Sequence, residues 1–144
     1  MPSPVIPCLL YRDAPAMIDW LCATLGFRVH ARYDDDQGGV AHAELILCDG
    51  MVMIGSTRET GFGSLQSAPA GGELGGAKTA ASIYLALPDA DAVEAAHDAA
   101  RAAGARIEQP LSSPAHGGRA FALRDPEGAL WSLGSYDPWA PKPG

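Results

Sequence analysis

The stretch YRDAPAMIDWLCATLGF, residues 11–27, decides the fold of this chain. Asp13 stands at the position of a helix N-cap, and Pro15 follows in the first turn, where a missing N–H is tolerated. The apolar residues after it recur at helical spacing and form one stripe: Met17, Ile18, Leu21, Cys22 and Leu25. Gly26 then offers the left-handed residue with which many helices end. The stretch therefore predicts one amphipathic helix with defined ends.

Strand patterns lie on both sides of this helix, and the whole arrangement then recurs. Short apolar or alternating runs predict strands over residues 5–11, 27–33, 40–47 and 51–54, the last two joined by the tight turn Cys48-Asp49-Gly50. In the second half, the predicted order is a strand over 81–87, an Ala-rich helix over 90–103, and strands over 106–111, 119–124 and 129–134. Both halves thus predict a β-α-β-β-β unit.

Three landmarks test whether the two halves are copies of one unit. The N-cap residues Asp13 and Asp89 lie 76 residues apart, and the glycines that end the helices, at 26 and 104, lie 78 apart. The turn glycines at 50 and 128 are also 78 apart. Three landmarks in the same order and with the same roles indicate a tandem duplication.

The segment between the halves has no periodicity. We divide the chain into a first module over 1–55, a linker over 56–79, a second module over 80–136 and a tail over 137–144, all in one domain. Long aperiodic segments are functional lids or linkers, and we interpret this one as a linker. Its GGELGG run is not expected to bind phosphate, because no strand precedes it and no helix follows it.

The composition describes a folded and acidic chain of 144 residues, 47% hydrophobic, with a net charge of −7. An acidic balance disfavours nucleic acid, which needs a basic surface. No apolar run reaches the roughly 20 residues of a membrane span, and the N-terminal residues lack the pattern of a signal peptide. The three cysteines form no metal or redox pair, and Cys8 and Cys22 are expected to be buried thiols. We expect a cytoplasmic protein without nucleic-acid or membrane partners.

Three stretches resemble one known family, the glyoxalase/bleomycin-resistance/extradiol-dioxygenase (vicinal oxygen chelate) superfamily. Residues 11–27 resemble its opening signature through Asp13 and Leu25-Gly26-Phe27, although the usual aromatic pair is reduced to Trp20 and Leu21. AHAELILCDGMVMIG and FALRDPEGALWSLGSYDPW resemble the closing strands of the two halves. The resemblance covers nearly the whole chain apart from the linker.

The resemblance implies an α+β fold in which two β-α-β-β-β modules form a curled mixed sheet with a cleft. Members of the family commonly dimerise, so a homodimer is expected. Their activities include isomerisation of thiohemiacetals, epimerisation, ring-cleaving oxygenation, thiol transfer to antibiotics and drug sequestration without chemistry. Because one fold supports all of these, the side chains of the site have to decide among them.

The metal-dependent members hold a divalent ion through a His or Gln on the first strand and a Glu on the last strand of a half. The resemblance places Ile6 and Ser82 at the first kind of position, and Ile54 and Ser132 at the second. None of these side chains is a strong ligand for a divalent ion, and a shift of the alignment by one residue restores none. We therefore expect no metal cofactor.

Polar residues on the expected strands suggest a ligand-binding wall. His42 and Glu44 are two residues apart in one strand and share a face. We interpret them as groups that hydrogen-bond a ligand, with a metal site made from His30, His42 and Glu44 as the alternative. His97, on the exposed side of the second helix, is expected to be solvated. His116 lies in a loop near the mouth of the second half, where a ligand contact is conceivable but not expected.

Aromatic residues complete the candidate site. Tyr84 and Trp131 fall on central strands of the second half and Tyr33 on a strand of the first, where such residues either fill the core or line a pocket. Aromatic faces in acidic surroundings suit a flat or cationic ligand, whereas Arg119 and Arg124 would suit an anionic one. The expected ligand-binding residues are therefore His42, Glu44, Tyr33, Tyr84, Trp131 and Arg119.

The interpretation that follows is a metal-independent protein that binds or sequesters a small aromatic or cationic molecule, in the manner of bleomycin-resistance proteins. The alternative is an enzyme, a metal-dependent lyase or isomerase of the lactoylglutathione-lyase type or a dioxygenase-like protein, with an atypical site at His42 and Glu44. A third reading is a structural or regulatory domain with a vestigial cleft. A search for bound metal and a search for bound ligand separate the three.

Overall fold

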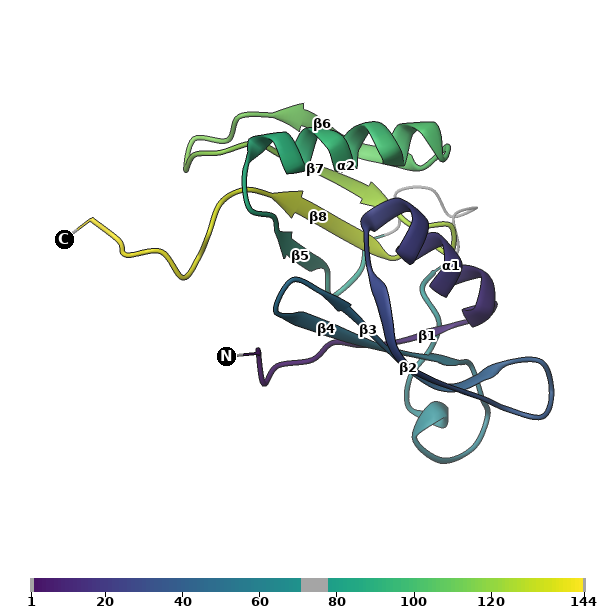
Figure 1. Cartoon of the computed structure of the whole chain (residues 1–144). Coiled ribbons are helices and arrows are strands. Elements are labelled where there is room, and N and C mark those ends of the chain that lie inside the picture. The colour runs from purple at the N-terminus through teal and green to yellow at the C-terminus, as the bar shows by residue number, and fades with distance from the viewer. Residues whose placement is uncertain (1, 71–77, 144) are drawn as a thin grey trace. The chain divides into compact units, whose positions relative to one another are not determined.

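The structure is a computed structural model that describes residues 2–70 and 78–143. The chain divides into two compact units (Figure 1), one made of Met1–Ala77 with Pro126–Gly128, the other of Lys78–Asp125 with Ala129–Gly144. Each unit holds one helix and one four-stranded sheet. The linker's GGELGG run lies outside the described residues, so the prediction made for it stays a prediction.

The first unit has the predicted β-α-β-β-β order. Its strands pair in the order β1-β4-β3-β2, with β1 parallel to β4 and the other pairs antiparallel. The elements are β1 (Cys8–Tyr11), α1 (Ala14–Leu25), β2 (Arg28–Asp34), β3 (Val40–Leu47) and β4 (Gly50–Ser56). A short 3-10 helix, η1 (Gly61–Ser64), follows in the segment predicted as linker.

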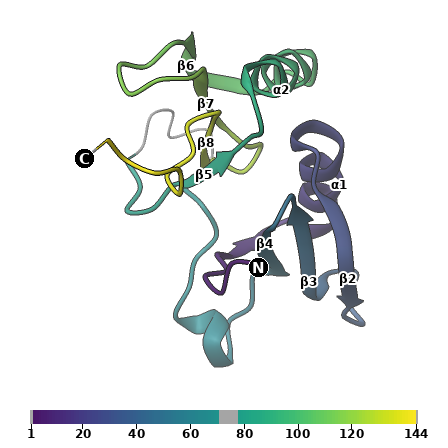
Figure 2. The ribbon, with the colours of Figure 1, turned by 60° about the vertical axis from the view of Figure 1, so that its left-hand side comes forward.

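Helix α1 confirms the signals from which it was predicted. The Asp13 side chain accepts a hydrogen bond from the Ala16 N–H at 3.2 Å, and Gly26 has φ +84°, the left-handed conformation that ends the helix. The apolar stripe is buried against β1, β3 and β4, and Figure 2 shows α1 on one face of that sheet. The local sequence thus fixes the helix, and its apolar face fixes which side of the sheet it covers.

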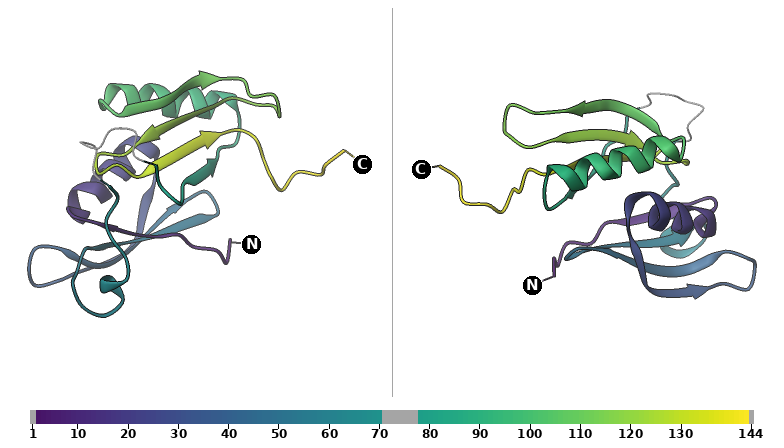
Figure 3. Two further views of the ribbon diagram at one scale, coloured as in Figure 1. Left: turned by 180° about the vertical axis from the view of Figure 1, so that it is seen from behind. Right: turned by 45° about the horizontal axis from the view of Figure 1, so that its top comes forward.

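The second unit repeats the first. Its strand order is β5-β8-β7-β6, again with one parallel pair, β5 with β8. Helix α2 is capped by Asp89, which accepts from the Ala92 N–H at 2.8 Å, and it contacts β6, β7 and β8 (Figure 3). The elements are β5 (Ile83–Ala86), α2 (Ala90–Ala102), β6 (Arg106–Ser112), β7 (Ala120–Arg124) and β8 (Leu130–Gly134).

A serine after each last strand gives independent evidence for the duplication. The Val40 N–H donates to the Ser56 hydroxyl oxygen at 2.9 Å, and the Arg119 N–H donates to Ser135 at 2.9 Å. Both the donors and the acceptors lie 79 residues apart. A glycine precedes each donor, and a Cβ on either glycine would come within 3 Å of the serine hydroxyl. The same closure of the sheet therefore recurs in both halves.

Two details of the first unit differ from the sequence predictions. Strand β1 begins at Cys8 instead of residue 5, since Pro7 has no N–H to donate to a neighbouring strand. Cys8 is exposed, so the prediction that its thiol is buried is wrong. Cys8 is the first residue of β1, and burial along this strand increases only toward Leu10 and Tyr11.

Each sheet has one face packed against its helix and one face without a helix, which we call the helix-free face. In the first unit, Val52 and Ile54 are buried on the α1 side. In the second unit, Trp131 and Leu133 are buried on the α2 side. The residues between them along each strand point the other way, because side chains alternate across a strand. The helix-free faces are where each unit can present a site.

Candidate ligand-binding site

A pocket of about 580 Å³ lies on the helix-free face of the second unit. Pockets that hold small molecules commonly have volumes of about 300–1,000 Å³. Its wall is formed by aromatic rings, prolines, small residues and a few uncharged polar groups. The lining residues are Tyr84, Gln109, Pro110, Ser112, Pro114, His116, Ala120, Phe121, Ala122, Ser132, Tyr136 and Pro138.

Small side chains on the central strands make the hollow. Ala122 pairs with Ser132 across β7 and β8, and Ala120 pairs with Gly134 one step further along. The Tyr84 ring lies over Gly134, where a Cβ would come to 2.6 Å from the tyrosine oxygen. Gly134 therefore gives Tyr84 the room to lie against the sheet, and the alanines leave the space beside it open.

Tyr84 connects the floor of the pocket to its rim. Its hydroxyl donates a hydrogen bond to the carbonyl oxygen of Tyr136 at 2.7 Å. Burial raises the pKa of Tyr84 above its ordinary value, and the nearby Tyr136 and Asp137 raise it further. The phenol therefore stays protonated and keeps its donor at neutral pH.

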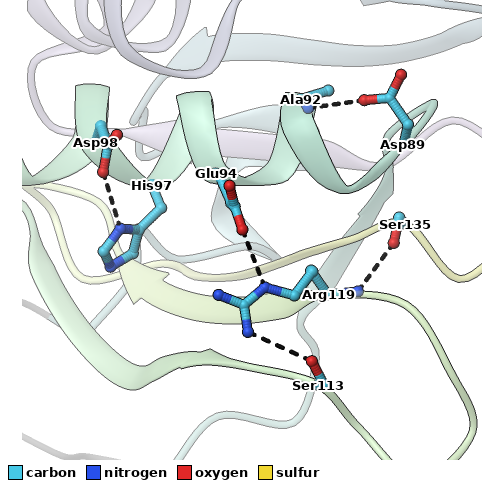
Figure 4. A network of polar contacts seen from close by, with 8 residues as sticks. All are labelled: Asp89, Ala92, Glu94, His97, Asp98, Ser113, Arg119 and Ser135. Atoms are coloured by element: carbon cyan, nitrogen blue, oxygen red, sulfur yellow. Dashed lines mark hydrogen bonds and ion pairs between the residues drawn. The ribbon is translucent and has the colours of Figure 1, made fainter.

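Arg119 organises the other side of the rim (Figure 4). Its guanidinium lies 3.3 Å from the Glu94 carboxylate of α2 and donates to the Ser113 hydroxyl at 3.4 Å. Its backbone is bound to Ser135, as described above, so it joins the loop over residues 113–118 to the end of β8. Arg119 does not line the pocket. Its contacts are with its own chain, and its observed role is to hold the loop that carries Pro114 and His116.

Three polar side chains of the pocket are open to a ligand. Within the described part of the chain, the side chains of Gln109 and Ser132 and the imidazole nitrogens of His116 have no hydrogen-bond partner. His116 packs edge-on against Tyr136, with ring centroids 4.8 Å apart. His116, which was not expected to contact a ligand, therefore lies in the lining of the pocket. An amide, a hydroxyl and an imidazole can supply both donors and acceptors to a bound molecule.

The helix-free face of the first unit carries a different group of residues. His42 Nε2 and Glu44 Oε2 are 2.9 Å apart, and the Tyr33 ring stacks on His42 with centroids 6.2 Å apart. The sequence prediction that His42 and Glu44 share one face is confirmed, and the strand register, which pairs Tyr33 with His42, adds Tyr33 to that face. Met53 and Cys8 continue the row beyond Glu44. The polar groups of this face are bonded to each other.

Trp131 lies in the core of the second unit. It is fully buried, at 0% exposure, and its indole N–H donates to Asp125 at 2.9 Å. The register explains why: Trp131 pairs with Ile83, whereas Tyr84 pairs with Ser132 on the opposite face. Of the predicted site residues, Tyr84 alone lines the pocket. His97 also differs from its prediction as a solvated residue, since its ring packs edge-on against Phe121 at 5.1 Å.

The residues present do not fit the divalent metal of the metal-dependent members. Ile54 is 2% exposed and lies on the α1 side, so the residue on the helix-free face is Met53, a thioether. Ser132 offers a neutral hydroxyl, which is a weak ligand for such ions. No group of three or more His, Cys, Asp or Glu side chains that could hold a metal occurs among the described residues, and His30 does not join His42 and Glu44.

The family follows from a comparison over most of the chain. Residues 6–133 match the family model described as the glyoxalase/bleomycin resistance protein/dioxygenase superfamily. The chain belongs to this superfamily. Its two β-α-β-β-β halves, each with its own mixed sheet and one helix, are the fold of this family, and the resemblance seen in the sequence is confirmed.

Solved structures agree with this assignment. TioX from Micromonospora sp. ML1 is 31% identical over 92% of this chain and 97% of its own, with a TM-score of 0.69. The fosfomycin resistance protein FosX from Listeria monocytogenes is 14% identical over 96% of both chains, with a TM-score of 0.66. A glyoxalase-related enzyme from Fulvimarina pelagi is 17% identical over 93% of this chain and 88% of its own, with a TM-score of 0.64. A comparison with curated proteins finds no match.

The fold could be predicted from the sequence, whereas most of the residues that line the pocket could not. Gln109, Tyr136 and Pro138 were not among the predicted site residues, although they line the pocket. A usable signal was present in the tail, where the sequence SYDPW places two aromatic residues directly after the last strand.

No helix among the described residues is long and apolar enough to cross a membrane.

Proposed function

We propose that the chain binds a small, flat, uncharged aromatic molecule in the pocket of its second unit, without a metal and without changing it chemically. The observation that carries this proposal is the pocket itself. It combines a volume of about 580 Å³ with the rings of Tyr84 and Tyr136 and with the alanines that keep it open. Flat apolar faces and small residues favour an aromatic guest.

The polar groups of the pocket favour a neutral ligand with a hydrogen-bonding edge. No Asp, Glu, Lys or Arg is among the lining residues of the described chain. Burying an ionised group without a partner is costly, so a charged ligand would lack compensation there. Gln109 and Ser132 can instead pair with an amide, a lactam or a ring nitrogen. This narrows the expectation of an aromatic or cationic ligand to a neutral aromatic one.

The biological setting we propose is sequestration of an antibiotic or a similar toxic compound in the cytoplasm. The family description includes bleomycin resistance, and one structural neighbour is a fosfomycin resistance protein. We also propose a homodimer, which light scattering would report as a mass near twice the 14.9 kDa of the chain. A mass of a single chain at micromolar concentration would contradict the dimer and leave the pocket unaffected.

Three probes that share one ring system and differ in charge test the proposal. 2-Naphthamide is neutral, 2-naphthylmethylammonium is cationic and 2-naphthoate is anionic. Calorimetric titration in the presence of EDTA should show 1:1 binding, tightest for the amide and weakest for the anion, because the chain carries a net charge of −7. Addition of zinc, nickel or manganese should leave the affinity unchanged. Binding of none of the three, or binding only after metal is added, would contradict the proposal.

The alternative of a metal-dependent lyase or isomerase has one observation in its favour, the His42–Glu44 pair at 2.9 Å. Two side chains leave a divalent ion short of protein ligands, since catalytic sites of this kind use about three. Elemental analysis of protein purified without chelators separates the two functions. Stoichiometric zinc, nickel, iron or manganese that is lost in a Glu44→Ala variant would favour the enzyme.

A further inference from the structure

The segment after β8 forms a folded strap beside the pocket, and it carries an exposed tryptophan. We define the strap as residues 135–142; Figure 1 shows this stretch leaving β8 toward the C-terminus. Tyr136 and Pro138 of the strap line the pocket. Trp139, the next residue along, is 93% exposed. A single exposed apolar residue is ordinary in a protein surface, so the argument depends on how this one is held and on what lies beside it.

The strap is organised by contacts on both sides of Trp139. The Asp137 carboxylate accepts the Trp139 N–H at 2.9 Å, and the Ala140 N–H donates to the Asp137 carbonyl at 3.2 Å. This is a turn closed by an Asp side chain and backbone. Trp139 is therefore placed by a defined turn.

Lys142 closes the strap from the other end. Its ammonium donates to the Tyr136 hydroxyl at 2.7 Å and to the Pro138 carbonyl at 3.0 Å, and it lies 4.7 Å from the centre of the Tyr136 ring. Tyr136 is thus held between Lys142 on the strap and His116 on the loop. Pro138 forms part of the pocket wall, and Trp139 follows it directly in the chain. The Cα atoms of consecutive residues are about 3.8 Å apart, so the indole is attached to the backbone next to that wall.

We propose that Trp139 is a ligand-contacting residue that stacks on the outer face of the aromatic molecule bound in the pocket. This inference rests on the proposed function and adds to it a ring that the unliganded pocket does not use. Tyr84 lies against the sheet at the floor, and the indole of Trp139 covers the ligand from the rim. The ligand class is then a planar ring system with two accessible faces, large enough to contact both residues.

The indole N–H signals of a nitrogen–proton correlation spectrum test the inference directly. The chain has three tryptophans, Trp20, Trp131 and Trp139, so three such signals are expected. A Trp139→Phe variant identifies the signal of Trp139 by its loss. On titration with 2-naphthamide, that signal should shift in saturable fashion, while the signal of Trp20, on α1 of the first unit, should stay in place.

Affinity gives the second readout, with a matched control. Trp139→Ala should weaken 2-naphthamide binding about three- to tenfold, the effect of one aromatic stacking contact, and Trp139→Phe should restore most of it. Phe62→Ala is the control, because Phe62 is also highly exposed but belongs to η1 of the first unit and does not line the pocket. It should leave the affinity unchanged.

The outcomes separate this inference from the proposed function. If wild-type protein binds the amide, Tyr84→Ala weakens binding and Trp139→Ala does not, the stacking role of Trp139 is overturned while the pocket stands. Absence of binding to the wild-type chain overturns both. An equal loss of affinity in Trp139→Ala and Phe62→Ala also overturns the role of Trp139, since it would reflect nonspecific binding of the probe to exposed apolar side chains.

Discussion

The helix-free faces of the two halves differ at positions that the duplication makes equivalent. Glu44 pairs with Met53 in the first sheet, and Ala122 pairs with Ser132 at the same place in the second. Two residues earlier along the strand, His42 of the first sheet corresponds to Ala120 of the second. At these positions one half therefore carries larger side chains in contact with each other, and the other a hollow.

The difference shows that side-chain volume, in two halves with the same fold, leaves a pocket on one face, and it supports the proposal that this half binds the ligand. His42 and Glu44 contact each other through Nε2 and Oε2, and the Tyr33 ring stacks on His42, so these groups already have partners on their own face. An exposed pair of this kind contributes little to stability, about 0–1 kcal/mol. In the second sheet the ion pairs lie beyond the pocket lining, where Glu108 contacts Arg106 and Arg124, and the pocket itself keeps open polar groups. The binding residues expected from the sequence come from both halves, and the proposed site uses only Tyr84 among them.

The largest expected effect comes from filling the hollow. Ala122→Phe should weaken binding of 2-naphthamide by at least about tenfold, since the new ring occupies the volume the ligand needs. Glu44→Phe, the same substitution at the equivalent position, should leave the affinity within about twofold, because that is within the usual scatter of independent sites. Calorimetry measures both, and circular dichroism checks that both fold.

A reversed result would break the comparison. If Glu44→Phe abolishes binding and Ala122→Phe does not, the ligand lies on the first face and the predicted roles of His42 and Glu44 are restored. Loss in both variants would indicate that both faces contribute to binding.

Removing the floor of the pocket should have the next largest effect. Tyr84→Ala should weaken binding about three- to tenfold, whereas Tyr84→Phe, which keeps the ring and loses the hydrogen bond to Tyr136, should cost about twofold to threefold. Cys8 is the control, because it pairs with Met53 as Tyr84 pairs with Ser132. Cys8→Ala should not change the affinity, and an effect equal to that of Tyr84→Ala would contradict the assignment.

The pH dependence of the pocket follows from the raised pKa of Tyr84. A raised pKa means that the folded state favours the protonated phenol. The stabilisation is therefore complete below the ordinary tyrosine pKa of about 10 and is lost as the pH rises through the higher value of the folded protein. The phenolate absorbance of the wild-type protein minus that of Tyr84→Phe, followed as a function of pH, should give a titration midpoint above pH 10. A midpoint below 10 would contradict the burial of this hydroxyl.

The smallest expected effect concerns the two β-hairpin turns. Cys48 has φ +51° in the tight turn between β3 and β4, whereas the longer turn between β7 and β8 uses Gly128, with φ +99°. An L-residue in the left-handed region costs about 1–2 kcal/mol, of which the extra chain entropy of glycine cancels a part. Cys48→Gly should raise the free energy of unfolding by about 0.5–1 kcal/mol, and Gly128→Ala should lower it by a similar amount. Urea unfolding that shows the same sign for both would contradict this reading.

The sequence predicted the elements well where local signals determine them. Helix α1 and strand β3 agree closely with their predictions, because caps, apolar stripes and alternation act over a few residues. The 3-10 helix η1 was missed, since its residues carry no period. Strand β1 was predicted too long because apolar residues continue through a proline that cannot donate a hydrogen bond.

The candidate site was harder to predict because it depends on register and on distant partners. Whether Trp131 or its neighbour faces the helix is set by the pairing of β5 with β8, strands far apart in the chain. Arg119 was expected to bind a ligand, and in the structure its guanidinium forms an ion pair with Glu94, a residue of another element. Neither the parallel register nor the position of a helix residue over a strand can be read from local spacing.

Mapping the bound ligand onto the two faces tests the central claim most directly. Amide and methyl signals of the isotope-labelled chain would be followed during titration with 2-naphthamide in EDTA. The account predicts saturable shifts around Ala120, Ala122 and Tyr84, with those of Glu44 and His42 unchanged. Shifts centred on His42 and Glu44, with the signals of Ala120 and Ala122 unmoved, would contradict it.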